Sequence, residues 1–275
     1  MAQVKIMMNG IPGNVAVTIA GNVKQDDRFE LLPYSLTGPE IDAEQYTLDS
    51  TAIQLIRPDQ KEEKIKKIIE EEGHFISIDF THPSAVNDNA DFYCSNHLPF
   101  VMGTTGGDRV RLEKTVQSSK TAAVIAPNMA KQIVGFQAMM AYAAETFPGL
   151  FKDYTLTITE SHQSTKADTS GTAKAMVGYF NRMGIAFTNE EIKKIRDHET
   201  QINKLGIPEE YIDGHGWHTY SLVSKNGTVS FEFKHNVNGR DVYSEGTMDA
   251  VLYLEKKIRE GLSGKVFTMI DVLKN

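Results

Sequence analysis

The chain of 275 residues is long enough for roughly two domains of about 150 residues each. It is 40% hydrophobic and 24% charged, which excludes a disordered, collagen-like or disulfide-scaffold protein. The 29 lysines and arginines against 36 aspartates and glutamates give a net charge of −7, so nucleic acid is not an expected partner. Cys94 is the only cysteine, which excludes an intrachain disulfide and fits a reducing compartment.

The apolar segments and the N-terminus predict neither a membrane span nor a targeting segment. The longest nearly apolar stretch, residues 133–144, is too short to cross the ~30 Å hydrocarbon core of a bilayer. Residues 4–8 lead into Asn9 and Gly10 without the basic region and cleavage site of a signal peptide. We therefore expect a cytoplasmic protein without a membrane partner.

The first 128 residues repeat one pattern, in which a short apolar run is followed by turn residues and a helix-like segment. This alternation is typical of βαβ units, and the continuous apolar runs indicate strands that are buried on both faces. We expect an α/β fold in which residues 1–128 form a doubly wound, Rossmann-like parallel sheet that binds a dinucleotide. The predicted strands are residues 4–8, 29–36, 75–80, 99–102 and 122–125, with an amphipathic helix over residues 59–72.

The pattern changes after residue 128. A small-residue helix is predicted over 129–146, and residues 154–159 and 229–234 alternate between apolar and polar side chains. Alternation indicates strands with one buried and one wetter face, so residues 129–244 predict an α+β domain with an open, mostly antiparallel or mixed sheet. Helix-like patterns cover 172–183, 189–196 and 247–260, and the C-terminal residues 245–275 are expected to pack back on the first domain.

A glycine-containing turn, GIPGNV over residues 10–15, follows the first predicted strand and opens a helix. In that position, residues without bulk let backbone N–H groups approach a pyrophosphate, which the positive end of the helix dipole also favours. The first two glycines are three residues apart, whereas the usual G-x-G-x-x-G motif has them two apart. An ordinary tight turn is the alternative interpretation.

The end of the second predicted strand bears on the choice of cofactor. An NAD site usually places a carboxylate there to receive the ribose 2′-hydroxyl. Here Ser35 and Thr37 supply hydroxyl groups, and Glu40 lies several residues further on. We therefore predict NADPH as the preferred or tolerated cofactor, with NADH possible, although no lysine or arginine stands in this loop.

The densest group of unusual polar residues spans residues 160–173 and directly follows an alternating strand. His162 exchanges protons near neutral pH, and Lys166 offers a cation for a carboxylate or a proton for transfer. The start of the next helix, at Ser170, Gly171 and Thr172, offers N–H groups and hydroxyls to an anion. The alternative is that Thr169 or Ser170 only caps the helix and that His162 and Lys166 are merely exposed.

These motifs together resemble the 4-hydroxy-tetrahydrodipicolinate reductase family. The resemblance rests on residues 10–13, 79–83, 103–106, 126–129 and 160–173, which occur in the family's order. It implies reduction of the cyclic imine made by the preceding synthase, on the diaminopimelate route to lysine, with NADPH or NADH. The family also suggests a homodimer or homotetramer that assembles through the second domain.

The resemblance implies a role for each matching position. His162 would be the general acid/base and Lys166 the proton donor, while Gln163, Lys166, Ser170, Gly171 and Thr172 would bind the substrate. The residues that would line the cofactor are Gly10, Ile11, Pro12, Gly13, Asn14, Val15, Ser35, Thr37, Phe80, Thr81, Gly103, Thr104, Thr105, Ala126, Pro127, Asn128 and Met129.

The segment after His162 departs from the common bacterial pattern. That pattern has two adjacent histidines, an arginine and a proline before Ser-Gly-Thr, whereas this chain has Gln163 after His162 and is one residue shorter before Ser170. This version is similar to the plant-type branch, as are residues 86–90 and 231–233. No plastid transit peptide is visible, so we expect either a mature plant chain, located in the plastid stroma, or a bacterial chain, located in the cytoplasm.

Two other functions fit parts of the sequence. A different dehydrogenase of amino-acid-like substrates would share the glycine turn but needs no pattern like residues 162–172, and a non-catalytic NADPH sensor would need neither His162 nor Lys166. His215 and His218 suggest a metal pair, but the sequence places no carboxylate or cysteine beside them, so we expect no metal.

Overall fold

The computed structural model describes residues 3–275, so the first two residues of the expected first domain lie outside the described chain. By its internal contacts the chain divides into two compact units. One unit runs to Lys131 and includes Asp241–Asn275, and the other is Gln132–Arg240. Within residues 3–275, every helix is too short or too polar to span a bilayer.

The first unit is built on a six-stranded sheet, in the order β13, β8, β7, β6, β1, β2, whose neighbouring strands all run parallel. This confirms the predicted Rossmann-like sheet. The chain moves from β1 to β2 on one side and to β6 on the other, so β1 and β6 mark the point where the strand order reverses. The strands are β1 (Val4–Asn9), β2 (Phe29–Leu31), β6 (Ile76–Asp79), β7 (Phe100–Met102), β8 (Ala123–Ile125) and β13 (Val266–Phe267).

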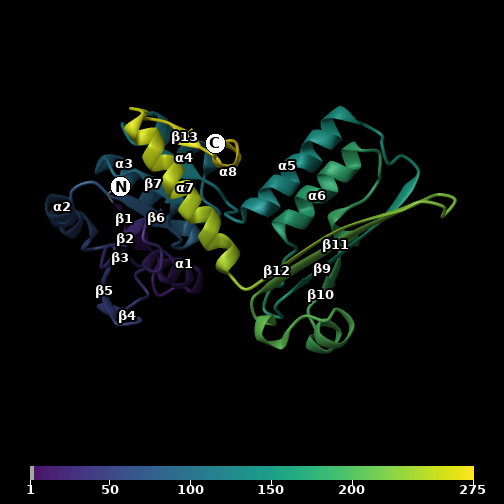
Figure 1. Ribbon diagram of the computed structural model, residues 1–275, viewed down its shortest axis with the longest axis horizontal. Coiled ribbons are helices and arrows are strands. Elements are labelled where there is room, and N and C mark those ends of the chain that lie inside the picture. The colour runs from purple at the N-terminus through teal and green to yellow at the C-terminus, as the bar shows by residue number, and fades with distance from the viewer. Residues whose placement is uncertain (1–2) are drawn as a thin grey trace. The chain divides into compact units, whose positions relative to one another are not determined.

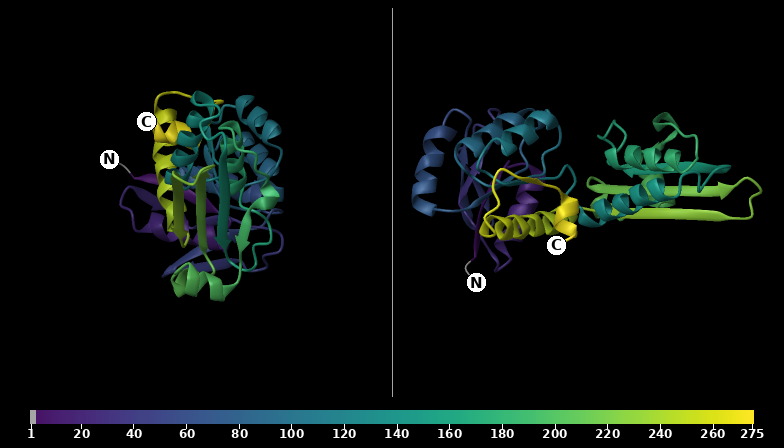
Figure 2. Two further views of the ribbon diagram at one scale, coloured as in Figure 1. Left: turned by 90° about the vertical axis from the view of Figure 1, so that its right-hand side faces the viewer. Right: turned by 90° about the horizontal axis from the view of Figure 1, so that it is seen from above.

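Helices cover this sheet because their apolar faces pack on the buried strands. Side chains of α2, α3 and α4 share one apolar cluster with Met7, Phe100 and Met102 of the sheet. The long helix α7 packs against α1, β7 and β8, and it lies beside the sheet in both Figure 1 and Figure 2. The helices are α1 (Asn14–Lys24), α2 (Lys61–Glu72), α3 (Val86–Ser95), α4 (Arg109–Gln117), α7 (Asp241–Arg259) and α8 (Met269–Leu273), with a short turn η1 (Pro83–Ala85).

The predicted single strand over residues 29–36 is wrong. Pro33 has no N–H for a strand ladder, so β2 ends at Leu31 and a new strand, β3 (Tyr34–Leu36), joins a different sheet. That small sheet has the order β3, β5, β4 and includes an unpredicted hairpin of β4 (Gln45–Leu48) and β5 (Thr51–Ile56). Asp49 makes the tight turn in the left-handed region, with φ of 48°.

The second unit contains a four-stranded mixed sheet, in the order β10, β9, β11, β12, as predicted for this part of the chain. β9 (Tyr154–His162) runs antiparallel to β11 (His215–Ser224), which pairs antiparallel with β12 (Ser230–Asn238). Helices α5 (Lys131–Thr146) and α6 (Gly171–Arg182) lie on one face of this sheet (Figure 1). Their side chains share an apolar core with Ile158, Tyr220 and Leu222.

The helix predicted over residues 189–196 is also wrong. The segment forms one turn, η2 (Asn189–Glu191), and then β10 (Lys193–Ile195), which pairs parallel with β9. Thr188 and Glu191 form a capping box around that turn, but only Ile192 is buried beyond it, so the segment has no apolar stripe to hold a helix on the core. A π-helical turn, η3 (Thr200–Lys204), and η4 (Glu209–Tyr211) complete the unit.

Candidate active site

The first unit has a cavity of about 850 Å³ at the carboxyl ends of its parallel strands. It lies at the β1 and β6 reversal point, where open α/β sheets bind ligands. We call it the strand-end cavity. Six of the residues predicted for the cofactor line it: Gly10, Pro12, Gly13, Thr37, Phe80 and Thr81.

Glycines shape the wall of the strand-end cavity. Gly10 has φ of 106°, and a Cβ atom there would overlap the carbonyl oxygen of Phe80. A Cβ at Gly103 would overlap the ring of Phe80. Helix α1 starts directly after Gly13, and no described side chain caps it. The first N–H groups of this helix are therefore available to an anion.

Ser35 and Thr37 support the glycine turn from behind. The fully buried hydroxyl of Ser35 accepts a hydrogen bond from the Ile11 N–H at 3.2 Å, and the Thr37 hydroxyl donates to the Ile11 carbonyl at 3.0 Å. Ile11 itself is fully buried, while Asn14 is exposed and Val15 half-buried at the helix start. The structure therefore places Ser35 beside the glycine turn. Thr37 both holds the turn through Ile11 and lines the strand-end cavity.

A buried carboxylate, Asp79, joins the ends of neighbouring strands. It accepts hydrogen bonds from the hydroxyls of Thr81 at 2.8 Å, Thr104 at 2.6 Å and Tyr93 at 2.8 Å. The Tyr93 hydroxyl also accepts from the Asn9 side chain at 3.1 Å. Burial, reinforced by the Asp79 charge, raises the pKa of Tyr93 well above its usual value, so it stays a neutral donor. This network fixes the loops after β1, β6 and β7 relative to one another.

The remaining predicted cofactor residues lie on the loops after β7 and β8, outside the lining of the strand-end cavity. Thr105 and Pro127 are exposed, whereas Ala126 and Met129 are buried. Asn128 is half-buried, and its side-chain oxygen accepts from the Ala130 N–H at 2.9 Å.

The cavity wall also includes polar residues that were not predicted to line the cofactor, among them Glu40, Lys61 and His82. Lys61, the first residue of α2, was interpreted only as part of a solvated helix, and its ammonium lies 4.7 Å from the ring centre of Phe92. The Glu40 carboxylate folds back over Gly38. No local motif marks Lys61, because β5 and the start of α2 bring it to the cavity only in the folded chain.

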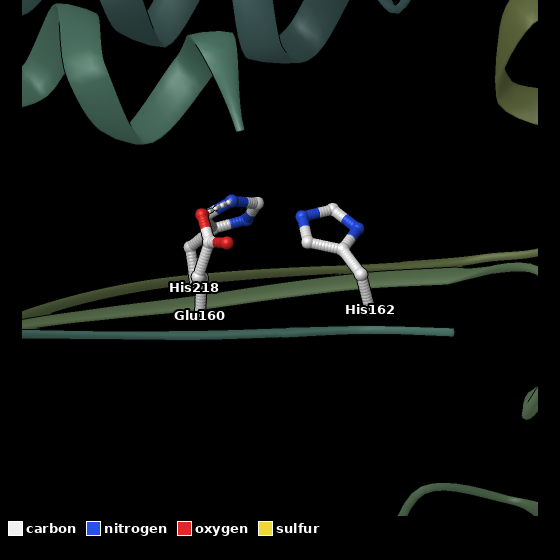
Figure 3. A group of neighbouring side chains, drawn as sticks. All are labelled: Glu160, His162 and His218. Atoms are coloured by element: carbon white, nitrogen blue, oxygen red, sulfur yellow. Dashed lines mark ion pairs between the residues drawn. The ribbon is translucent and has the colours of Figure 1, made fainter. Parts of the chain in front are cut away.

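In the second unit, three polar side chains share one face of the sheet (Figure 3). Glu160 and His162 are two residues apart on β9, and His218 on β11 is the cross-strand partner of Glu160. Residues 160–162 therefore belong to the strand, and the prediction that the polar group 160–173 begins only after the strand is wrong. Glu160 is fully buried, and His218 is 4% exposed.

Burial keeps the two imidazoles neutral. It lowers the pKa of His162 to about 4 and that of His218 well below its usual value. The Nδ1 atom of His162 lies 3.2 Å from the His215 carbonyl, and its Nε2 atom has no hydrogen-bond partner among the described residues. Among the described residues, His162 thus has a buried ring nitrogen without a hydrogen-bond partner.

The donor atoms of Glu160, His162 and His218 lie within 4.8 Å of one another, close enough to form a candidate metal group. The expectation that no carboxylate lies near His218 is therefore wrong, since its Nε2 is 3.9 Å from Glu160. The reason is cross-strand register, which single-sequence spacing does not show. Both Glu160 oxygens are already engaged, however, by Arg196 at 2.5 Å and by the Ser170 N–H at 3.0 Å.

The 163–170 loop carries Lys166 and ends at the start of α6. The Lys166 ammonium pairs with Asp168 at 2.7 Å, and this hydrogen bond lowers the pKa of the Asp168 carboxyl. Gln163 is half-buried, and its carbonyl accepts from the Lys166 N–H at 3.0 Å. The side chain of Ser170 caps α6 by accepting from the Thr172 N–H at 3.2 Å, as the capping interpretation required. Gly171 is exposed beside it.

A third histidine, His215, and the tryptophan lie on the other face of the same strands. His215 is buried, and its Nε2 lies 2.8 Å from the Ser161 hydroxyl. Trp217 is the cross-strand partner of Ser161 and donates to Asn238 at 2.7 Å. The two faces of β9 and β11 therefore carry different polar groups, and only one face includes His162.

A strand-end cavity at a glycine turn, in one chain with a second unit that carries His162 at a strand end and Lys166 in the next loop, is typical of a two-domain α/β oxidoreductase of the Rossmann class. The family models for dihydrodipicolinate reductase match this chain at residues 4–129 for the N-terminal part and 133–273 for the C-terminal part. The chain belongs to the dihydrodipicolinate reductase family, which confirms the resemblance and the expected enzyme class.

Plant relatives are similar over nearly the whole chain. The chloroplastic 4-hydroxy-tetrahydrodipicolinate reductase 2 of Arabidopsis thaliana is 44% identical over 273 residues, covering 98% of this chain and 77% of that protein. The probable chloroplastic reductase 1 of Oryza sativa subsp. japonica is 44% identical over 269 residues, covering 98% and 78%. A dipicolinate-bound dihydrodipicolinate reductase from Paenisporosarcina sp. TG-14 has the same fold, with 16% identity, a TM-score of 0.67 and coverage of 97% and 98%.

Proposed function

We propose that the protein reduces 4-hydroxy-tetrahydrodipicolinate to tetrahydrodipicolinate in the diaminopimelate route to lysine. The observation that carries this proposal is the match to plant reductases of that name at 44% identity over 98% of the chain. The reaction adds a hydride and a proton to the unsaturated ring after its hydroxyl leaves as water. The oxidised nicotinamide is the other product.

NADPH is the proposed cofactor, and NADH is the weaker alternative. The turn at residues 10–13 and the uncapped start of α1 suit its pyrophosphate. Lys61 supplies to the same cavity the cation that the loop after Leu36 lacks, which favours a 2′-phosphate, while Glu40 opposes it. When bound, the reduced nicotinamide supplies the hydride.

The 163–170 loop and the start of α6 bind the two carboxylates of the substrate. Lys166 exchanges its Asp168 partner for a substrate carboxylate, and the Gly171 N–H and the Thr172 hydroxyl receive the other, since the Thr172 N–H already donates to Ser170. The Gln163 amide adds a hydrogen bond without charge. A dianion held in this way neutralises Lys166 and leaves a single orientation for the ring.

Lys166 and His162 manage the proton. Lys166 is the donor to the ring, because burial lowers the pKa of His162 to about 4 and leaves that imidazole neutral at pH 7 in the unliganded protein. A bound dianion favours the charged form of a neighbouring imidazole, so His162 is the general acid/base partner that exchanges protons with Lys166.

The proposal also covers the oligomeric state of the protein and its cellular compartment. We expect a homodimer or homotetramer that assembles through the second unit, where Met139, Tyr142, Val223 and Phe231 are exposed apolar side chains. The location is the cytoplasm, or the plastid stroma for a plant chain, and the plant relatives are named chloroplastic. The molar mass in solution tests the assembly.

The direct test couples the purified chain to the preceding synthase and follows NADPH absorbance. We expect NADPH consumption that requires both the synthase and its substrates, with lower kcat/KM for NADH. A reaction without the synthase is the control for oxidation of NADPH alone. Absence of synthase-dependent consumption by the folded protein overturns the proposed function.

A further inference from the structure

Arg196 follows β10 and connects three parts of the second unit. Its side chain is only 18% exposed and reaches the backbone of the 163–170 loop, the end of β9 and the fully buried Glu160 carboxylate. None of the sequence motifs includes Arg196, because it lies 30 residues beyond Lys166 in the chain. The parallel pairing of β10 with β9 brings it there.

Each N–H donor of the Arg196 guanidinium is engaged. The Nε atom donates to the Lys166 carbonyl at 2.8 Å. One terminal nitrogen donates to a Glu160 carboxylate oxygen at 2.5 Å and to the Asp168 carbonyl at 3.3 Å. The other donates to the carbonyls of Ile195 at 3.0 Å and Glu160 at 3.4 Å. Arginine is the side chain with five donors in a rigid planar fork, and all five are used here.

Glu160 extends this connection to α6. While one of its oxygens pairs with Arg196, the other accepts the Ser170 N–H at 3.0 Å. The Arg196–Glu160 pair therefore ties the backbone of Lys166 to the residue that caps α6. His162 is held separately, since the buried Gln201 amide donates to its carbonyl at 2.8 Å.

The charge of Arg196 is balanced within its own pair. Glu160 neutralises Arg196, and Lys166 has a separate partner in Asp168, so neither cation is unpaired. Replacing a buried ion pair by apolar residues often costs no stability, so stability alone gives this pair no role. A role in binding does explain the pair. The rigid guanidinium fixes several carbonyls of the loop, and a loop that is ordered before the substrate binds loses less conformational entropy in the binding step.

We propose that Arg196 is a positioning residue for the reduction. Together with Glu160, it holds the Lys166 backbone and the opening of α6 in the arrangement that receives the substrate's carboxylates before the substrate arrives. This inference rests on the proposed function of the 163–170 loop, and it adds a residue that acts through Lys166 without contacting the ring.

The first test replaces Arg196 with lysine, which keeps the charge but has three donors on a flexible stem. We expect kcat/KM for the substrate to fall by roughly 10²-fold, with a raised substrate KM and an unchanged KM for NADPH. Arg182→Lys is the matched control, since its guanidinium lies over the Tyr179 ring on α6 and takes no part in the pair. An unchanged substrate KM in Arg196→Lys overturns the proposal.

A double-mutant cycle with Lys166→Ala separates positioning from a general structural role. If Arg196 acts in part through Lys166, Arg196→Lys in the Lys166→Ala background lowers kcat/KM by less than it does in the wild type, and the remaining loss comes from the opening of α6. Equal losses in both backgrounds overturn the proposal while leaving the proposed function intact, whereas a wild-type chain inactive with NADPH overturns the proposed function. If Arg196→Lys fails to fold, Glu160→Gln takes its place in the same cycle.

Discussion

The strand-end cavity of the first unit and the 163–170 loop of the second are held in place by different interactions. Around the cavity, close backbone contacts at Gly10 and Gly103 and the hydrogen bonds to Asp79 fix the wall. Around the loop, ionic groups do so, since Arg196 and Glu160 fix the backbone while Asp168 pairs with Lys166.

This difference separates two kinds of recognition. A wall made from backbone suits a ligand whose phosphates accept hydrogen bonds from N–H groups. Whether this wall tolerates a substitution depends on whether the new side chain fits without overlapping its neighbours. A loop held by charges suits a small dianion, and its tolerance depends on which charges remain. Substitutions in the two regions should therefore affect different kinetic constants.

The largest effect is expected from Lys166→Ala. Removing the proposed proton donor should lower kcat by roughly 10²-fold or more, while the affinity for NADPH stays nearly constant. Steady-state kinetics with each substrate varied in turn measures both quantities. Lys174→Ala on α6 is the matched control, because Lys174 is an exposed lysine outside the 163–170 loop. An unchanged kcat in Lys166→Ala would remove Lys166 from the mechanism.

Gly10→Ala should weaken the binding of NADPH, which Lys166→Ala leaves nearly constant. The added Cβ overlaps the Phe80 carbonyl and strains a residue with φ of 106°, so we expect KM for NADPH to rise about 30-fold with a smaller change in substrate KM. Gly21→Ala is the control, since it lies in α1 with open space around its Cβ position. Equal changes in both KM values would contradict the separation of the two regions.

Lys61→Met should change cofactor preference more than overall rate. Loss of its cation removes an attraction for the 2′-phosphate, so the ratio of kcat/KM for NADPH over NADH should fall about tenfold. Glu40→Gln should raise the same ratio, because it removes a negative charge from the same cavity. Lys66→Met, at an exposed position five residues further along α2, serves as the control. If Lys61→Met leaves this ratio unchanged, Lys61 does not determine the preference for NADPH over NADH.

The smallest expected effect is a change in the free energy of unfolding with pH. Burial lowers the pKa values of His162 and His235 to about 4 and that of His218 well below normal, whereas an unfolded imidazole has a pKa of about 6.5. The unfolded chain therefore binds more protons between these values, so the free energy of unfolding should fall as pH drops from 7 to 5.

Each half-buried histidine should contribute on the order of 1 kcal/mol to this loss. Urea unfolding at a series of pH values measures it, with the range above pH 7 as the flat reference. His235→Gln should make the profile shallower, since it removes one titrating group. A free energy of unfolding that is constant from pH 7 to 5 would show that these imidazoles accept protons in the folded state.

The sequence was sufficient for elements whose patterns are local. The first strand, the glycine turn and α1 lie within 21 consecutive residues, Val4–Lys24, and repeated buried runs predicted five strands of the parallel sheet but not its edge strand β13. The break at Pro33 was visible in the sequence but was overruled by the apolar residues on either side. β11 was not predicted, although Tyr220 and Leu222 alternate with Thr219 and Ser221 as in a strand. Its histidines were interpreted only as a possible metal pair.

The unpredicted parts of the candidate site depend on contacts between distant segments. Glu160 meets His218 through the register of two strands, Arg196 reaches Lys166 through a third strand, and Lys61 reaches the strand-end cavity from the start of a helix. Spacing along one strand or helix cannot specify such meetings, because they depend on which elements pair and in which register. Motifs found His162 and Lys166, but the groups that hold or complement them needed coordinates.

Trp217 is the one tryptophan in the chain. It pairs across the sheet with Ser161, the residue before His162, and the Lys234 ammonium lies 5.5 Å from its ring centre. Its indole fluorescence therefore arises from a single place, on the strand beside the proposed substrate loop. Titrating the unlabelled protein with a dicarboxylate ligand should change that emission, which offers an optical readout of occupancy that is independent of NADPH turnover.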